Sequence, residues 1–365
     1  MTFENLTDLQ IAAYESQTRP LAHDDISFIP QQLPFEVGMA AVTPSVTGSL
    51  SSGNHGSLSD GLSQEQLAFW DKNGYLIIPG ALSGETVHEL LSETQEMLDE
   101  FSTTGLKDHP GTKFSTGEGD ADHVGDDYFL TSGDKIRFFF EEDAFSPSGE
   151  LLGPVPASIN KIGHALHVLS EPFRRITLSP ENAAIAKSLS FRDPRCLQSM
   201  VICKQPRIGG AVPPHQDSTF LYTDPPSAVG FWYALEDAVA GNGCLSFASG
   251  SHKRAAVEKR FVRMGEVEEG KAGTGFTANE GERFPEGLGL DSNAAVGSTE
   301  EYTVGEVKAG TLVLIHGNLL HKSERNTSAK SRFIYTFHLI EGQNDYDKCN
   351  WLQPDEKGFE RIFRS

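Results

Sequence analysis

The feature that most constrains the fold of this chain is a change in the spacing of apolar residues near Gln198. Before it, apolar residues recur at helical spacing; after it, short strand-like runs alternate with turn residues. The runs read SMVICKQ, HQDSTFLY, VGFWYALED, CLSFA, TLVLIHG and FIYTFHLI. Helices followed by six or more short strands predict an α+β domain whose core is a β-sandwich or barrel.

Several elements are expected before that change. Residues 83–101 carry apolar side chains at helical spacing and predict an amphipathic helix. Further helices are expected over 160–169 and 179–189, and Ser63 with Gln66 resembles the capping box that opens a helix. The apolar runs YLIIPGAL and KIRFFF predict two strands.

The composition divides the chain into an N-terminal extension, 1–61, and a folded region, 62–365. The end of the extension, 44–61, is rich in Ser, Gly, Thr and Asn, so it predicts a linker within a largely disordered segment. Within the folded region, the acidic, glycine-rich stretch 258–301 is too long for an ordinary connection. We expect it to form either a lid or a disordered excursion.

Net charge and cysteine content limit the partners and the compartment that are expected for this chain. The net charge of −21 argues against nucleic acid as a partner, and no stretch approaches the roughly 18 apolar residues of a membrane helix. The four cysteines are widely spaced and there is no secretory or organellar start, which favours a reducing compartment. A cytoplasmic protein is therefore expected, with no prediction of its oligomeric state.

The first candidate for chemistry is His215-Gln216-Asp217. In a strand, residues i and i+2 point to the same face, so an imidazole and a carboxylate would converge on one point. With a second histidine they would form the facial triad of non-haem iron oxygenases, which leaves metal positions open. A chain of this composition is expected to contain about one such tripeptide by chance, so the motif alone favours a loop histidine beside a solvated aspartate.

The second candidate lies further along the chain. His316 and His321 both follow the apolar run TLVLI, and only one of them can complete a triad. His321 precedes Arg332, which shares a strand face with Ile334 and Thr336. A histidine followed one strand later by a buried arginine suits a dicarboxylic co-substrate, because a guanidinium pairs with a carboxylate through two hydrogen bonds.

Several motifs together resemble one family. The segments are SGDKIRFFFEE, INKIGHALH, QSMVICKQP, HQDSTFLYTDP, NGCLSFASGSH, LIHGNLLHKS, SRFIYTFHLIEG and NWLQP, and they span about 62–354. Their order and content resemble the phytanoyl-CoA dioxygenase family. The resemblance implies a double-stranded β-helix, or jelly-roll, core flanked by helices. It also implies that His215, Asp217 and His321 bind Fe(II) and that Arg332 clamps the 2-oxoglutarate carboxylate.

The same resemblance implies five further contacts to 2-oxoglutarate: Lys135, Met200, Gln216, Trp232 and Ser323. The residues themselves say less. Lys135 is equally consistent with an ordinary surface lysine, and Met200 and Trp232 lie in apolar strands where plain core packing is expected as readily.

The implied activity is a dioxygenase that uses Fe(II), 2-oxoglutarate and O₂. We expect it to hydroxylate a small organic substrate, anionic or lipid-like, with release of succinate and CO₂. Two alternatives stay open: a catalytically weak jelly-roll that serves as a 2-oxoglutarate and metal sensor or scaffold, and a metal-dependent isomerase of cupin type. Arg332 at its offset from His321 argues against the isomerase.

Two other groups receive structural interpretations. His164 and His167 lie three apart in the segment expected to be helical, and without a nearby carboxylate they are predicted to be a packed or hydrogen-bonded pair. A locally basic run contains Lys253, Arg254, Lys259, Arg260 and Arg263. It is predicted to be a solvated face, with contact to an anionic substrate as the alternative.

Overall fold

The structure is a computed structural model that describes residues 58–109, 111–113, 126–265, 273–288 and 300–363. Chain contacts divide the protein into Met1–Gly48 and Ser49–Ser365, and every described residue belongs to the second unit. The predicted disorder of 1–61 therefore falls almost wholly outside the described residues. The described part begins with a 3-10 helix, Leu58–Asp60.

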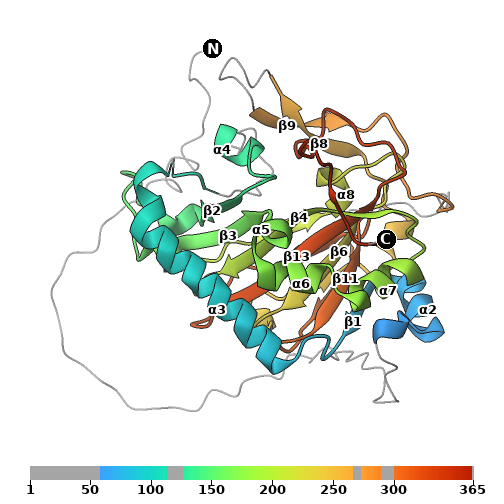
Figure 1. The fold of residues 1–365 in the computed structure, drawn as a ribbon, viewed down its shortest axis with the longest axis horizontal. Helices are drawn as coiled ribbons and strands as arrows, with labels where there is room; N and C mark the ends of the chain where they lie inside the picture. The colour runs from blue at the N-terminus through green and yellow to red at the C-terminus, as the bar shows by residue number, and fades with distance from the viewer. Residues whose placement is uncertain (1–57, 110, 114–125, 266–272, 289–299, 364–365) are drawn as a thin grey trace, which may run out of the picture. The chain divides into compact units, whose positions relative to one another are not determined.

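Two antiparallel sheets form the centre of the fold (Figure 1). The larger sheet runs in the order β1-β11-β6-β13-β4-β3-β2, and β14 pairs with β4. Its strands are β1 (Tyr75–Ile78), β2 (Ile136–Phe140), β3 (Ile159–His164), β4 (Pro194–Lys204), β6 (Val229–Ala234), β11 (Leu312–His316), β13 (Arg332–Glu341) and β14 (Glu360–Arg361).

The smaller sheet has the order β10-β7-β12-β5. Its strands are short: β5 (Val212–His215), β7 (Leu245–Phe247), β10 (Thr303–Gly305) and β12 (His321–Ser323). Strands that follow one another along the chain often belong to different sheets, as in a jelly roll. The expected α+β class with a double-stranded β-helix core is confirmed.

Helices cover one face of the larger sheet (Figure 1). They are α3 (Gly84–Glu100), α5 (Leu166–Leu169), α6 (Glu171–Thr177) and α7 (Pro180–Ser188), with α2 (Gln64–Asn73) beside β1 and α4 (Asp127–Leu130) near β2. Leu90 of α3 and Phe173 of α6 join Tyr335 and Phe337 of β13 in one apolar core. The predicted capping box is present, since Ser63 and Gln66 exchange hydrogen bonds.

The opposite face of the larger sheet looks toward the smaller one. Side chains alternate along a strand, so Tyr335 and Phe337 enter the helix-side core while Arg332 and Thr336 line a cavity between the sheets. The alternation predicted for this strand is therefore confirmed.

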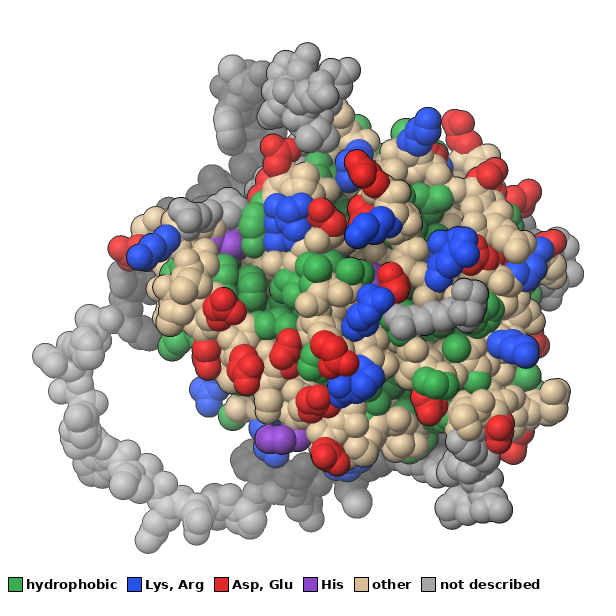
Figure 2. All heavy atoms as spheres, in the orientation of Figure 1, with side chains coloured by type: hydrophobic (Ala, Val, Ile, Leu, Met, Phe, Trp, Pro, Cys, Tyr) green, Lys and Arg blue, Asp and Glu red, His purple; other side chains and the backbone are tan. Residues whose placement is uncertain are grey.

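On the helix-bearing face seen in Figure 2, acidic and basic side chains are interspersed with apolar ones.

Two sequence predictions of secondary structure are wrong. The helix expected over 160–169 is β3, which ends at His164, followed by the single helical turn α5. Pairing with β2 and β4 on both sides decides the conformation there. The strand expected for HQDSTFLY ends at His215, and α8 (Asp217–Phe220) follows.

The acidic insertion is partly described. It contributes an antiparallel hairpin, β8 (Lys259–Met264) with β9 (Gly273–Ala278). Residues 266–272 and 289–299 of the insertion lie outside the described residues. Among the helices that are described, none has both the length and the apolar character needed to cross a membrane.

Candidate metal and co-substrate site

Three candidate ligands meet at one end of the smaller sheet. His215 is the last residue of β5 and lies opposite His321, the first residue of β12, in the antiparallel ladder. Asp217 opens α8 beside them. Asp217 Oδ1 lies 3.5 Å from His215 Nε2 and 3.7 Å from His321 Nε2, and the potential ligand atoms of all three residues lie within 4.8 Å of one another.

Hydrogen bonds orient both imidazoles. His215 Nδ1 lies 3.0 Å from the carbonyl oxygen of Pro213, and His321 Nδ1 lies 3.0 Å from that of Leu319. A carbonyl only accepts, so each Nδ1 carries the proton. Each Nε2 is therefore left with a lone pair directed at the shared point, which is the tautomer that a metal ligand requires.

The protonation states also suit a metal. Burial lowers the pKa of His321 to about 4, so this imidazole is neutral near pH 7. Burial alone would raise the pKa of Asp217, but His321, His338 and His215 outweigh it and hold that pKa well below its usual range. His338 of β13 lies with Nε2 3.4 Å from Asp217 Oδ2. No local pattern in the sequence singles out His338, because its role depends on the pairing of distant strands.

The convergence of His215 and Asp217 does not need a continuous strand. Gln216 between them is extended, with φ −119° and ψ 129°, and this alone turns both neighbours to one side. The Gln216 side chain points elsewhere, because its Nε2 donates to the carbonyl oxygens of Ala255 and Asn318 at 2.9 and 2.8 Å. The expected contact of Gln216 with 2-oxoglutarate is therefore not supported by its position.

Arg332 supplies a buried cation at the other end of the same cavity. Its residue exposure is 2%, it makes no ion pair with the described residues, and its Nε has no hydrogen-bond partner among them. The guanidinium lies 5.6 Å from the centre of the Trp232 ring. Burial lowers its pKa to about 10, so the group stays charged near pH 7. A buried cation of this kind calls for an anionic ligand.

Lys204 lies opposite Arg332 in the β4–β13 ladder. Its Nζ donates to the carbonyl oxygens of Gly210 and Glu324 at 2.7 Å each and to Ser323 Oγ at 3.0 Å. These three bonds use all three ammonium hydrogens. Ser323 Oγ therefore accepts, and its own hydrogen is free to point to another group. Burial lowers the pKa of Lys204 to about 7.

Two glycines make room for the Lys204 side chain. A Cβ at Gly209 would lie 2.5 Å from Lys204 Cγ, and a Cβ at Gly243 would lie 2.8 Å from Lys204 Cδ. Gly243 also has a φ of +80°, which other residues rarely adopt. Lys204 was not singled out from the sequence, since a lysine in an apolar strand carries no signal of its own.

The remaining predicted contacts divide into two groups. Met200, Trp232 and Ser323 line the cavity, but Lys135 does not. Lys135 is exposed and its Nζ pairs with Asp134 at 2.5 Å, in the turn before β2. The structure thus corrects the prediction for Lys135, and the lysines that line the cavity are Lys161, Lys204 and Lys322.

The cavity has a volume of about 260 Å³ and a second, aromatic end. The ring of Phe220 lies 6.0 Å from that of His215 and 5.5 and 5.9 Å from those of Phe261 and Phe276 on the hairpin. Phe220 and Phe276 are only partly buried, although both line the cavity. Trp351 closes this end, with its ring 6.5 Å from that of Phe261.

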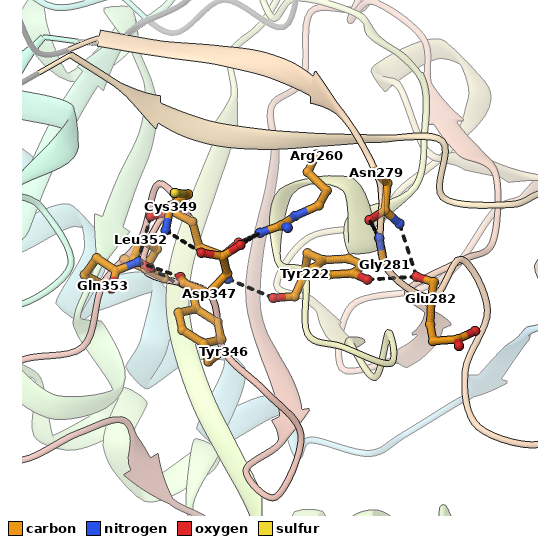
Figure 3. A network of polar contacts seen from close by, with 11 residues as sticks. Tyr222, Arg260, Asn279, Gly281, Glu282, Tyr346, Asp347, Cys349, Leu352 and Gln353 are labelled. Atoms are coloured by element: carbon orange, nitrogen blue, oxygen red, sulfur yellow. Dashed lines mark hydrogen bonds and ion pairs between the residues drawn. The ribbon is translucent and has the colours of Figure 1, made fainter.

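A polar network fixes the hairpin in place (Figure 3). Arg260 of β8 donates from Nη2 to Asp347 Oδ2 at 2.8 Å and to Asn350 Oδ1 at 2.9 Å, and its guanidinium stacks 4.3 Å above the Tyr222 ring. Arg263 donates from Nε to the carbonyl oxygen of Trp351 at 2.7 Å. The prediction that this basic run is a solvated face is therefore wrong for Arg260 and Arg263.

A jelly roll that brings two histidines, an aspartate and a buried arginine into one cavity defines the class of non-haem iron oxygenases that use 2-oxoglutarate. The sequence model of the phytanoyl-CoA dioxygenase family matches residues 70–334, and the chain belongs to that family. It is 43% identical over 299 residues to phytanoyl-CoA dioxygenase domain-containing protein 1 of Bos taurus and 39% identical over 297 residues to phytanoyl-CoA dioxygenase of Arabidopsis thaliana. These matches cover 80% and 81% of this chain and 95% of each relative.

Solved structures agree on the fold. The carbocyclase SnoK from nogalamycin biosynthesis, described as non-heme and alpha-ketoglutarate dependent, superposes with a TM-score of 0.52 at 20% identity, covering 80% of this chain and 89% of that one. EctD from S. alaskensis with bound Fe gives 0.50 at 18% identity, with 79% and 80% covered. The family membership shows that the chain is a 2-oxoglutarate-dependent non-haem iron dioxygenase that uses Fe(II), 2-oxoglutarate and O₂.

Proposed function

We propose that this enzyme hydroxylates a small organic molecule whose reacting part is apolar, with release of succinate and CO₂. The observation that carries the proposal is the composition of one cavity: three metal-ligand side chains lie between a cluster of aromatic rings and a buried guanidinium that makes no ion pair with the described residues. Only the Arg332 end of the cavity suits a dicarboxylate. The aromatic end is therefore left for the substrate.

The donor set fits Fe(II). His215 and His321 would coordinate through Nε2 and Asp217 through a carboxylate oxygen, because the Nδ1 atoms are held by carbonyl groups. When bound, iron supplies the oxidising chemistry, in which one atom of O₂ enters the substrate and the other enters succinate. His338, 3.4 Å from Asp217, fixes the orientation of that carboxylate.

The chain's other residues would bind and orient the co-substrate. Arg332 pairs with the remote carboxylate of 2-oxoglutarate, and Ser323 donates its free hydrogen to the same group. Lys204 holds Ser323 in that orientation and adds positive charge. Met200 and Trp232 pack against the carbon chain of the acid.

The aromatic end would exclude water and hold the substrate. Phe220 links the ring of His215 to the hairpin, so an apolar group packed on Phe220 and Phe276 lies beside the metal ligands. The cavity is small for a ligand site, so either the substrate is small or only its reacting part enters.

We also propose the cytoplasm as the compartment. All four cysteines are free thiols, and Cys196, Cys203 and Cys244 are buried without forming disulfides. Reduced cysteines are typical of a reducing compartment.

The test is succinate formation by the purified chain with Fe(II), 2-oxoglutarate and O₂, followed by mass spectrometry of a metabolite extract. We expect succinate, and one metabolite replaced by a product heavier by one oxygen atom. Binding of 2-oxoglutarate without any succinate would overturn the proposal and favour a sensor.

A further inference from the structure

Five buried polar atoms on cavity-lining residues have no partner among the described residues: Glu141 Oε1, His164 Nε2, Gln198 Oε1, Arg332 Nε and His338 Nδ1. Two of these atoms belong to His164 and Gln198. Both residues line the cavity, with residue exposures of 1% and 6%. A buried polar atom left unpaired is costly, so such atoms in a ligand cavity indicate what the ligand brings. Neither residue has a part in holding the metal or 2-oxoglutarate in the function proposed above.

The tautomer of His164 follows from its neighbour. Ser132 Oγ donates its single hydrogen to the carbonyl oxygen of Phe129 at 2.6 Å. His164 Nδ1 lies 2.7 Å from the same Oγ, so Nδ1 must carry the proton and donate it to Ser132. Burial lowers the pKa of His164 well below its usual range, so the ring is neutral. His164 Nε2 is therefore a lone-pair acceptor.

Gln198 adds a second polar group near the metal ligands. It pairs in the β4–β13 ladder with His338, which lies 3.4 Å from Asp217. Its amide can turn to present either an acceptor or a donor, whereas the acceptor of His164 is fixed. Gln198 is next to Ser199, the ladder partner of His164, so a hydroxyl group, which both donates and accepts, suits the two residues.

The surroundings disfavour a cationic donor. Burial first, and then Lys161 and Arg137, oppose a positive charge at His164. The rings of Trp351, Phe139 and Phe129 lie 5.3, 5.5 and 5.7 Å from the His164 ring. A substrate group that reaches His164 thus passes through aromatic surroundings.

We propose that the substrate carries an uncharged hydroxyl group on an apolar body, and that this hydroxyl donates a hydrogen bond to His164 Nε2 and contacts the Gln198 amide. The inference rests on the proposed function, since it concerns the substrate end of the same cavity. The hydroxyl is a recognition group, distinct from the carbon that reacts.

The test uses two probes with the same phenylpropyl body, 3-phenylpropan-1-ol and its methyl ether; the ether carries one more methyl group and cannot donate a hydrogen bond. Their affinities are measured by calorimetry on the full chain loaded with Zn(II) and 2-oxoglutarate, so that no turnover occurs. One hydrogen bond predicts that the alcohol binds about five- to tenfold more tightly than the ether. An ether that binds as well as the alcohol, or failure of both to bind, overturns the inference.

Variants locate the effect. His164→Leu should remove the preference for the alcohol, whereas His167→Leu should keep it, because His167 is equally buried but does not line the cavity. Independently of any ligand, Gln198→Met removes a buried amide whose Oε1 has no partner among the described residues, and should raise the melting temperature by about 2 °C. A fall would show that Gln198 already has a partner and would overturn its role.

Succinate formation, measured on the iron-loaded form of the same preparation, separates this inference from the proposed function. A preference for the alcohol without succinate would overturn the enzyme proposal and leave the recognition site. Succinate formation without the preference would do the reverse.

Discussion

The two ends of the cavity are built differently. The co-substrate end takes Arg332, Lys204 and Ser323 from β13, β4 and β12, where neighbouring strands fix each side chain through ladder register. The substrate end takes Phe261 and Phe276 from a hairpin outside both sheets, and Trp351 from a segment after the last long strand. One end is fixed by the fold itself, and the other by side-chain contacts between added segments.

This difference implies that residues at one end of the cavity can change without disturbing the other end. A change at the co-substrate end disturbs charged groups that the sheets bury, whereas a change in the hairpin leaves the sheets intact. We therefore expect that the family reaction and the choice of substrate can be altered independently. The following predictions test that separation, from the largest expected effect to the smallest.

Loss of a metal ligand should affect both ends together. Replacing a residue that hydrogen-bonds to a metal ligand typically costs up to about 100-fold in metal affinity or activity. His321 is itself a proposed ligand, so His321→Ala should lower succinate formation by more than about 100-fold. The control is His316→Asn, at a half-buried histidine whose Nδ1 accepts a hydrogen bond from the backbone N–H of Asn318. Metal content by mass spectrometry and turnover provide the measurement, and a metal-free His316→Asn protein would point to the other histidine.

Loss of Arg332 should affect the co-substrate end alone. A hydrogen bond to a charged group contributes about 1.5–3 kcal/mol, so Arg332→Met should raise the dissociation constant of 2-oxoglutarate about 10- to 100-fold. Iron content should stay unchanged. Calorimetry with 2-oxoglutarate checks this, and an unchanged constant would remove Arg332 from the site.

Lys204 should act through Ser323. Lys204→Met and Ser323→Ala should each weaken 2-oxoglutarate binding about fivefold, and the double variant no further. Lys135→Met, at the exposed lysine, is the control and should bind normally. Additive losses in the double variant would contradict the coupling.

The same lysine predicts a pH dependence. Burial lowers the pKa of Lys204 to about 7, and a bound dicarboxylate favours its charged form. As the pH rises through about 7 the free chain loses this charge, so the 2-oxoglutarate dissociation constant should rise. The rise should be absent from Lys204→Met; if that variant shows the same profile, another group is responsible.

The smallest effect is expected at the hairpin. Arg260→Met removes hydrogen bonds to Asp347 and Asn350, and should lower the free energy of unfolding by about 1 kcal/mol while leaving 2-oxoglutarate binding unchanged. Arg283→Met, which breaks an exposed pair with Glu258, should change stability by only a few tenths of a kcal/mol. Denaturant titration checks both, and weaker 2-oxoglutarate binding in Arg260→Met would show that the two ends are coupled.

Sequence patterns predicted the residues of the co-substrate end better than those of the substrate end. Arg332 and His321 lie in strands whose alternation is visible locally, and the structure brings both to one cavity. Lys204 and His338 could not be found in this way, because their partners come from strands far away in the chain. Lys135 was placed by motif likeness, which says nothing about the direction of a side chain in a turn.

The errors in secondary structure have a similar origin. His164 was assigned to a helix because local composition does not reveal pairing on both sides of β3. The residues after His215 were assigned to a strand, yet only the extended Gln216 was needed to bring His215 and Asp217 together. Tertiary contacts override local preference in both places.

The pairing of His215 with His321 gives the metal a mechanical role. The β5–β12 ladder is short and irregular, with a register shift next to His321. A metal held by both histidines would join strands about a hundred residues apart in the chain. Because the unfolded chain lacks the assembled site, the free energy of metal binding would add to the stability of the folded state. The smaller sheet would then gain its rigidity on metal binding, and a chelator would loosen this edge of the jelly roll before the helix-covered sheet.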